Sequence, residues 1–224
     1  TYRHSGNYIL NEIHGELFVD ILDEGSNKIY RAGGDREVSL YEFLKTNEDS
    51  SFVFVKGAGG TGKTISMIQT CRKLLKEGIC AVYIPLNKIR FQNSEDPIKK
   101  YIHKHIMGCD GSMFRSFESM ANSSVKNNVY LFLDGVNELP VSAAESFEKY
   151  METAAESSEW SGTRFVLASR TEMEINNVKS EILDMMPLEE EKIRSFLDKR
   201  SVEMPEDEKV LELIDNPLML GLYA

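Results

Sequence analysis

Residues 57–64 read Gly-Ala-Gly-Gly-Thr-Gly-Lys-Thr, and they follow residues 52–55, which are all Phe or Val. A short run of aromatic and β-branched residues predicts a buried strand. Residues 64–77 predict a helix with basic residues in its last turns and Gly78 as its stop. The glycines between strand and helix allow successive backbone N–H groups to turn toward one anion, because no Cβ obstructs them. The segment therefore predicts a phosphate-binding loop.

The spacing of this loop is that of a complete Walker A pattern, with Gly57 followed after four residues by Gly62-Lys63-Thr64. In this pattern the lysine reaches the β- and γ-phosphates, and the threonine hydroxyl ligates Mg²⁺. The cofactors we expect are ATP or ADP with Mg²⁺. The residues expected to bind the nucleotide from this loop are Gly57, Ala58, Gly59, Gly60, Thr61, Gly62, Lys63, Thr64 and Ile65.

A second strand-like run, residues 129–139, reads VYLFLDGVNEL and ends in a carboxylate, Asp134. The ligand crevice of a parallel α/β sheet lies at the carboxyl ends of its strands. A carboxylate at that edge is able to hold Mg²⁺ opposite the Thr64 hydroxyl, directly or through water. We therefore predict Asp134 to be the Walker B acid, with Thr64 and Asp134 as the metal ligands and with Lys63 and Asp134 both acting in catalysis.

From residue 52 onward the chain alternates strands and helices, which is typical of a parallel sheet with helical crossovers. Further strands are expected at 81–84 and 164–168, an irregular helical region at 97–121, and a helix opened by a capping box, Ser142 to Glu145. This helix is expected to bury a stripe that consists of Phe147, Tyr150, Met151, Ala154 and Ala155. The fold class is therefore α/β, a P-loop three-layer parallel sheet flanked by helices.

The two ends of the chain read differently from this central part. Residues 16–22 and 28–32 predict a hairpin, and Ser39 with Glu42 predicts a capping box for a short helix. Residues 189–200 and 206–215 predict two amphipathic helices, and a third starts near Leu218. We expect an N-terminal hairpin and helix linker at 1–50, the nucleotide-binding domain at 51–186, and the start of a truncated small helical domain at 187–224.

The composition of the 224 residues is that of a soluble globular protein, with 42% hydrophobic and 28% charged residues. The net charge of −10 argues against a nucleic-acid partner that covers a whole face. No apolar run is long enough for a membrane span, and Cys71, Cys80 and Cys109 predict reduced thiols in the cytoplasm. His103, His105 and Cys109 do not predict a metal site, because positions i and i+2 of a helix point apart.

Several classes of P-loop protein are disfavoured because the sequence lacks their characteristic residues or motifs. GTPases read guanine with Asn-Lys-x-Asp, and the nearest match here, residues 87–90, ends in Arg90. Helicases and many motor ATPases place a glutamate directly after the Walker B aspartate, where this chain has Gly135. The signature of ABC transporters and the arginine-rich lid of small-molecule kinases are also missing from the sequence. Adenine is therefore expected in preference to guanine.

The remaining pattern resembles the NACHT family of STAND signal-transduction NTPases. The motifs that carry the resemblance are GAGGTGKT at 57–64, LFLDGVNEL at 131–139, FVLASR at 165–170 and NPLML at 216–220. The resemblance implies that Arg170 contacts the γ-phosphate and that Pro217 lies near the adenine. It also implies that Glu138 polarises the attacking water. Asn137 departs from the family, which often has aspartate there, and this leaves the rate of hydrolysis open.

The resemblance implies an ATP-dependent switch in a signalling or defence protein of the NLR-like, innate-immunity type. In such a protein ADP holds a closed state, and exchange for ATP permits homo-oligomerisation. The chain opens on Thr1 and closes on an apolar run, so we expect a fragment of a parent chain whose effector, sensor and winged-helix regions lie outside it. Two alternatives stay open: an AAA+-like ATPase motor, and a nucleotide-binding scaffold that does not hydrolyse.

Overall fold

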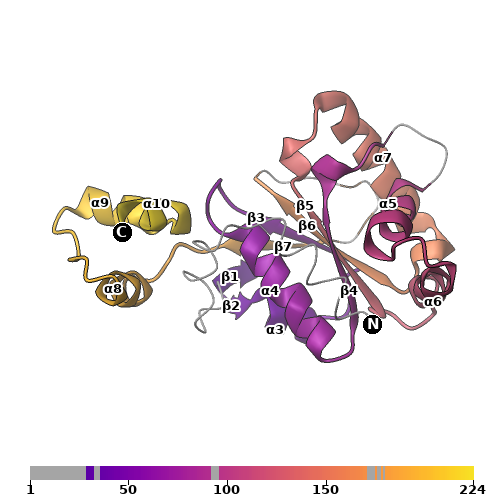
Figure 1. Cartoon of the computed structure of the whole chain (residues 1–224), viewed down its shortest axis with the longest axis horizontal. Coiled ribbons are helices and arrows are strands. Elements are labelled where there is room, and N and C mark those ends of the chain that lie inside the picture. Colours follow the sequence, from indigo (N-terminus) through magenta and orange to yellow (C-terminus); the bar gives the residue numbers. More distant parts are fainter. Residues whose placement is uncertain (1–28, 33–35, 92–95, 171–174, 176–177, 179) are drawn as a thin grey trace.

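The computed structural model describes the chain from residue 29 onward, apart from residues 33–35, 92–95, 171–174, 176–177 and 179. The strand expected at 16–22 lies outside the described residues. The described part contains one sheet with helices on both faces and a group of three helices at the C-terminal end (Figure 1).

The sheet has seven strands in the order β2-β1-β7-β3-β6-β5-β4. Five of them, β7, β3, β6, β5 and β4, run parallel, while β1 pairs antiparallel with both β7 and β2. The strands are β1 (Ile29–Ala32), β2 (Arg36–Ser39), β3 (Phe52–Lys56), β4 (Cys80–Pro85), β5 (Val129–Asp134), β6 (Thr163–Ser169) and β7 (Ser180–Met185). The parallel α/β fold expected from the sequence is thereby confirmed.

Two strands correct the expectations from the sequence. Strand β7 was not expected from the sequence. Its residues, Ser-Glu-Ile-Leu-Asp-Met, bury only Leu183 completely, so they do not form the continuous apolar run that marks the other central strands. The strand is held by its neighbours instead, since Val55 of β3 pairs with Leu183. Strand β2 was also missed, and the observed hairpin pairs Ile29 with Ser39. Residues 36–39 therefore extend the sheet beyond β1.

Two apolar cores lie between the sheet and the helices on its two faces. Alternate residues of β3 belong to different cores: Val53 and Val55 pack toward α3 (Leu40–Thr46) and α4 (Lys63–Lys76), and Phe52 and Phe54 pack toward the other side. The second side is covered by α5 (Pro97–Tyr101), the π-helical turn η2 (Ile102–Ile106), α6 (Gly111–Ala121) and α7 (Val141–Glu156). Short 3₁₀ turns, η1 (Leu86–Lys88), η3 (Val136–Glu138) and η4 (Ser158–Trp160), connect these elements. Burial on both faces explains the continuous apolar runs in the strands.

Of the two capping boxes predicted from the sequence, the structure contains one. The capping box of α3 is formed as expected, with Ser39 and Glu42 bonding each other's backbone N–H groups. The capping box expected at Ser142–Glu145 is wrong, because α7 begins at Val141 after Pro140 and has no side-chain cap. Ser142 thus lies inside the first turn. Ala155 is exposed, so it does not belong to the buried stripe of α7.

A fully buried arginine of the sheet contacts α3. Arg164 of β6 donates from Nη1 to the carbonyl oxygen of Leu44 at 2.9 Å, and its guanidinium lies 5.9 Å from the ring centre of Phe43. Burial lowers the pKa of this guanidinium, with the nearby Tyr130 opposing the effect. Helix α3 is therefore part of the same packed layer as α4.

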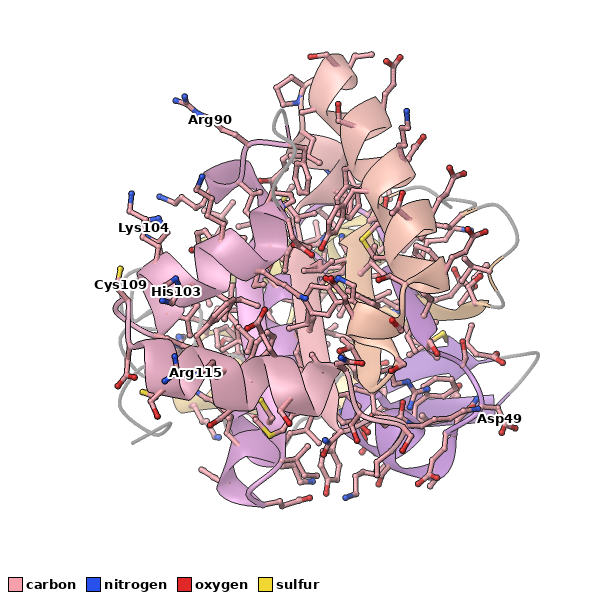
Figure 2. All side chains as sticks on the ribbon, turned by 90° about the vertical axis from the view of Figure 1, so that its right-hand side faces the viewer. Asp49, Arg90, His103, Lys104, Cys109 and Arg115 are labelled. Atoms are coloured by element: carbon pink, nitrogen blue, oxygen red, sulfur yellow. The ribbon has the colours of Figure 1, made fainter. Side chains whose placement is uncertain are left out.

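The region expected to be irregular, 97–121, is broken into α5, η2 and α6. Gly108 and Cys109 both have positive φ, 58° and 64°, at the turn before α6. His103 packs on Phe114 with 4.6 Å between ring centres, and His105 packs on Tyr101 at 5.0 Å. Figure 2 shows His103, Lys104 and Cys109 at the edge of this layer. The two imidazoles therefore serve different aromatic contacts.

The three C-terminal helices form a small core of their own. They are α8 (Glu190–Lys199), α9 (Glu208–Ile214) and α10 (Pro217–Tyr223), close to the bounds expected from the sequence. Their shared core consists of Leu188, Ile193, Phe196, Leu197, Ile214 and Leu220. In the part of the chain that the structure describes, no helix combines the length and apolar character needed to span a bilayer.

Gly162 provides a test of the packing between β6 and α6. A Cβ at Gly162 would stand 2.6 Å from the carbonyl oxygen of Met120 and 3.0 Å from that of Ser123. Gly162→Ala should lower the free energy of unfolding by about 1–3 kcal/mol, because backbone must move to make room. Gly111→Ala is the matched control, since its Cβ would meet only Arg115 at 3.5 Å. Equal denaturant midpoints for the two variants would contradict this packing.

Candidate functional site

The glycine-rich loop joins β3 to α4 through left-handed backbone. Gly60 has φ of 78° and Gly62, the residue before the helix, has φ of 92°. These are conformations in which residues other than glycine are strained. The N-terminal end of α4 points at the loop, so its unpaired N–H groups face the same space as the loop backbone.

Lys63 folds back over the loop that precedes it. Its Nζ donates to the carbonyl oxygens of Gly57 at 2.6 Å and Ala58 at 2.7 Å. Burial lowers the pKa of Lys63, the charge of Asp134 opposes this, and Arg170 lowers the pKa further. The ammonium group is thus half-buried and bonded to neutral carbonyls, in a place where an anion would stabilise its charge.

Asp134 at the end of β5 accepts two short hydrogen bonds. The Thr64 hydroxyl donates to Asp134 Oδ2 at 2.6 Å, and the Tyr83 hydroxyl donates to the same oxygen at 2.6 Å. The sequence analysis brought Thr64 and Asp134 together but missed Tyr83. Tyr83 lies on β4, where Pro85 pairs with Asp134, so the alternation of strand side chains could have placed it on the same face.

The Tyr83 hydroxyl is a permanent donor in this contact. Burial raises the pKa of Tyr83 above its usual range, and the charge of Asp134 and the hydrogen bond to it raise it further. Tyr83 therefore stays protonated at any physiological pH. Its hydroxyl hydrogen is directed at the carboxylate throughout that range.

The turn after Asp134 depends on glycine. Gly135 has φ of 85°, and a Cβ there would lie 3.2 Å from Glu138 Oε2. Asn137 and Glu138 follow in η3, and both are exposed and line the cleft beside the loop. The position that carries glutamate in helicases is therefore occupied here by a residue whose backbone conformation excludes a side chain at low strain.

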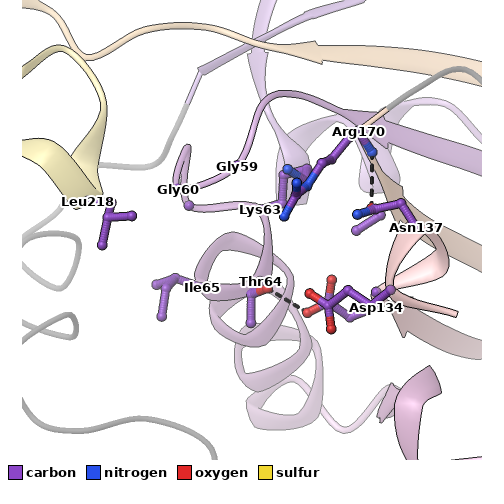
Figure 3. A pocket seen from close by; sticks show the side chains of 13 residues that line it. Gly59, Gly60, Lys63, Thr64, Ile65, Asp134, Asn137, Arg170 and Leu218 are labelled. Atoms are coloured by element: carbon purple, nitrogen blue, oxygen red, sulfur yellow. Dashed lines mark hydrogen bonds between the residues drawn. The ribbon is translucent and has the colours of Figure 1, made fainter. Parts of the chain in front are cut away.

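Arg170 stands at the end of β6, between the ends of β3 and β5 in the sheet. Its backbone N–H donates to Asn137 Oδ1 at 3.2 Å, and its Nη2 lies 3.6 Å from where a Cβ of Gly59 would be. Figure 3 shows Arg170 and Lys63 converging above Asp134. Two cationic side chains thus face the same cleft.

The C-terminal helices reach the loop through the start of α10. Asn216 Nδ2 donates to the Gly59 carbonyl oxygen at 3.0 Å, and the Leu218 backbone N–H donates to that of Gly60 at 3.3 Å. Asn216 also caps α10 by accepting from Leu218 N at 3.0 Å. The sequence analysis singled out only Pro217 here. Pro217 is buried as the first residue of α10, and its neighbours make the contacts with the loop.

The cleft at this edge collects most of the residues expected from the sequence. It is lined by Gly59, Gly60, Gly62, Lys63, Thr64, Ile65, Asp134, Gly135, Asn137, Glu138, Ala168, Arg170 and Leu218 (Figure 3). Gly57, Ala58, Thr61 and Pro217 are not among its lining residues. Thr61 instead donates from its hydroxyl to the Ala58 carbonyl oxygen at 2.8 Å, inside the loop.

The donor set suits a hard divalent cation that brings other ligands with it. Thr64 and Asp134 supply a hydroxyl and a carboxylate, which are ligands that Mg²⁺ prefers. Within the described residues, no group of three or more His, Cys, Asp and Glu side chains is placed to hold a metal ion. A cation held by Thr64 and Asp134 would therefore complete its shell with water and with oxygens of a bound ligand, as Mg²⁺ does with phosphates.

No protein-family model matches the chain, and no curated protein matches it. Among solved structures, it is similar to the replication initiator DnaA bound to AMPPCP and single-stranded DNA (17% identity, TM-score 0.47, 94% of this chain and 61% of that chain). It is also similar to AMPPCP-bound DnaA from Aquifex aeolicus (18%, 0.47, 80% and 55%) and to domain III of DnaA from Thermotoga maritima (19%, 0.47, 80% and 76%).

The chain spans 61% and 55% of the first two of these structures. Strand β3, the loop at 57–62 and helix α4, with Asp134 on a parallel strand opposite, give it the architecture of a P-loop NTPase domain.

The contact between the loop and α10 is open to a direct test at Gly60. A Cβ at Gly60 would stand 2.8 Å from Asn216 Oδ1 and 2.8 Å from Leu218 Cβ, at a φ of 78°. Gly60→Ala should destabilise the protein by about 1–2 kcal/mol from backbone strain alone and should speed hydrogen exchange in α10. Gly59→Ala is the control, because its Cβ would meet only Arg170 at 3.6 Å. Unchanged exchange in α10 of Gly60→Ala would contradict the contact.

Proposed function

We propose that this chain is the ATP-binding part of a molecular switch, with slow Mg²⁺-dependent hydrolysis coupled to conformational change. The observation that carries the proposal is the 2.6 Å hydrogen bond from the Thr64 hydroxyl to Asp134, at the mouth of a complete phosphate loop. This bond joins a residue at the start of α4 to the end of a strand two places away in the sheet. It is the arrangement expected of a Walker A threonine and a Walker B aspartate.

Lys63 and the loop backbone form the binding site for the phosphates. The ammonium now bonds the carbonyls of Gly57 and Ala58, and burial makes its charge unfavourable there. A bound triphosphate would offer it charged acceptors at the same edge of the sheet, and charge-assisted bonds are stronger than those to neutral carbonyls. Arg170, which faces the same cleft, adds a second cation for the terminal phosphate.

Thr64 and Asp134 are the residues that would hold Mg²⁺. When bound, the ion would supply positive charge that neutralises the phosphates. The protein contributes orientation: the Thr64 hydroxyl and the Asp134 carboxylate already contact each other, so no rearrangement of backbone is needed to bring the two oxygens together. A binding site prepared in this way lowers the free-energy cost of ordering on binding.

Glu138 is the candidate for polarising the attacking water. It is exposed on the cleft, and Asp134 and Glu138 are the two carboxylates among the cleft's described lining residues. Asn137 has a different role, because its amide oxygen accepts from the Arg170 backbone N–H at 3.2 Å. This contact holds the turn after β5 against the end of β6. The replacement of aspartate by Asn137 therefore removes a potential base while keeping a structural bond.

The switch character of the proposal is supported by the contact between α10 and the loop. Asn216 and Leu218 bond the carbonyls of Gly59 and Gly60, whose N–H groups belong to the phosphate-binding loop. A change of the loop on gaining or losing a terminal phosphate would thus act on the helical group α8–α10. A ligand shifts such an equilibrium by its different affinity for the two states. Oligomerisation of the parent protein would be the response, as in the NACHT-type STAND proteins that the motifs resemble.

Loss of the Lys63 ammonium tests the binding site for the phosphates. Mg²⁺-ATP at about 100 times its Kd should stabilise the wild type by about 2.7 kcal/mol, seen as a raised melting temperature. Lys63→Ala should lose most of that shift, because the charged partner of the phosphates is gone. Lys56→Ala is the control, since Lys56 ends β3 directly before the loop and its Nζ lies 3.7 Å from Asp184 Oδ1. Equal shifts for wild type and Lys63→Ala would refute the proposal.

The hydrolytic residues are tested by single-turnover assays. Glu138→Gln should keep ATP affinity while hydrolysis falls, because removal of a general base slows a reaction about 10²–10⁴-fold, and by less if the wild type is already slow. Asn137→Asp should raise turnover modestly or leave it unchanged. Asn137→Ala should lower turnover, because the turn after β5 loses its hydrogen bond to the Arg170 backbone. Hydrolysis by Glu138→Gln at the wild-type rate would mean that Glu138 is a structural acid, and it would favour the nucleotide-binding scaffold over the switch. Fast turnover that rises with protein concentration would favour an AAA+-like motor.

A further inference from the structure

We propose that Tyr83 is a positioning residue for the metal-binding carboxylate: its hydroxyl holds Asp134 Oδ2 so that the other carboxylate oxygen is presented to Mg²⁺. The inference rests on the proposed function, because it concerns the nucleotide-bound metal. It assigns a role to a residue outside the phosphate loop and outside the strand that carries Asp134.

The geometry places the tyrosine on a rigid support. β4 and β5 are parallel neighbours, and Pro85 pairs with Asp134 at their carboxyl ends. Tyr83 lies two residues earlier on β4, on the same face, about 6.6 Å below that end at the usual rise of a strand. A tyrosine side chain is long enough to cover this distance, and its hydroxyl reaches Asp134 Oδ2 at 2.6 Å. The ring is buried with Phe132 and Met67 in the core beneath α4, so the hydroxyl has little freedom to move.

The two donors to Asp134 differ in what metal binding requires of them. Thr64 would itself become a ligand, so its hydroxyl must satisfy the metal and the carboxylate together. Tyr83 has no such second task, since its hydroxyl contacts the carboxylate from the neighbouring strand. Within the described part of the chain, both hydrogen bonds to the Asp134 side chain end on Oδ2. Oδ1 is therefore the oxygen that the protein leaves for the cation.

This arrangement follows a general feature of metal sites. Groups that hydrogen-bond a ligand without touching the metal fix the orientation of that ligand, and their loss weakens metal affinity about 10–100-fold. Without the Tyr83 hydroxyl, the carboxylate of Asp134 would keep only the Thr64 donor and would be free to rotate when that hydroxyl turns to the cation. The expected consequence is weaker binding of Mg²⁺ and not of the nucleotide by itself.

The experiment measures ATP affinity by calorimetry with excess Mg²⁺ and with EDTA, and takes the ratio of the two Kd values as the metal dependence. In the wild type, Mg²⁺ should tighten binding strongly. Tyr83→Phe keeps the buried ring and should lower this ratio about 10-fold or more, with the Kd in EDTA nearly unchanged. Tyr130→Phe is the matched control, because Tyr130 is a buried tyrosine of β5 whose hydroxyl interacts with Arg164; this variant should keep the wild-type ratio.

A double-mutant cycle separates positioning from packing. In an Asp134→Asn background, Tyr83→Phe should no longer alter the metal dependence, because the negatively charged partner is absent. A merely structural tyrosine would change the Kd values in Mg²⁺ and EDTA by the same factor. Three outcomes would overturn the inference and leave the proposed function standing. They are an equal change of both Kd values, a ratio within twofold of the wild-type ratio, and loss of folded protein in Tyr83→Phe. Absence of ATP binding by the wild type would overturn the proposed function and the inference with it.

Discussion

The hydrogen bond between Thr64 and Asp134 is the contact on which the candidate site depends, because it spans the sheet. Thr64 follows β3, and Asp134 ends β5, with β6 between them. The end of β6 therefore forms the floor of the cleft and supplies Ala168 and Arg170. Two further polar side chains lie next to this bond: Tyr83 of β4 donates to Asp134, and Lys63 is the residue before Thr64 at the start of α4.

The charged side chains of the cleft form a cationic group and an anionic group, which a bound anion and a bound cation would neutralise. Lys63 and Arg170 converge, and the charge of Arg170 helps to lower the pKa of Lys63. Asp134 and Glu138 provide the opposite charge on the β5 side. Phosphates placed between the cations, with a divalent cation on the Asp134 side, would match both groups. The cleft is thus pre-organised for a charged ligand, which is the main way in which a protein stabilises transferring phosphoryl groups.

The same loop has two neighbours, and this links the site to the rest of the molecule. On one side Arg170 lies over Gly59, and Asn137 holds the backbone of Arg170. On the other side Asn216 and Leu218 bond the carbonyls of Gly59 and Gly60. The space around Gly60 is filled by Asn216 and Leu218 so closely that a methyl group would not fit. Any movement of the loop must therefore be accompanied by movement of α10 or by loss of these two hydrogen bonds.

The sequence by itself determined the parts of the site that depend on local order along the chain. The spacing of Gly57, Gly62, Lys63 and Thr64 specifies a strand, a tight loop and a helix start, and the run ending in Asp134 specifies a buried strand with a carboxylate at its end. Such features are visible because backbone conformation and burial on both faces restrict the residue types locally. The α/β class and the three C-terminal helices followed from the same kind of pattern.

The tertiary structure decided what depends on neighbours far apart in the chain. Strand β7 has a mixed sequence, and its pairing with β3 is what makes it a strand. The donor Tyr83 is an ordinary strand residue until the register of β4 on β5 brings its hydroxyl to Asp134. Asn216 caps α10, and only the packing of α10 on the loop directs its amide to Gly59. The physical reason is common to all three: each role is fixed by a non-local contact, which no window of the sequence contains.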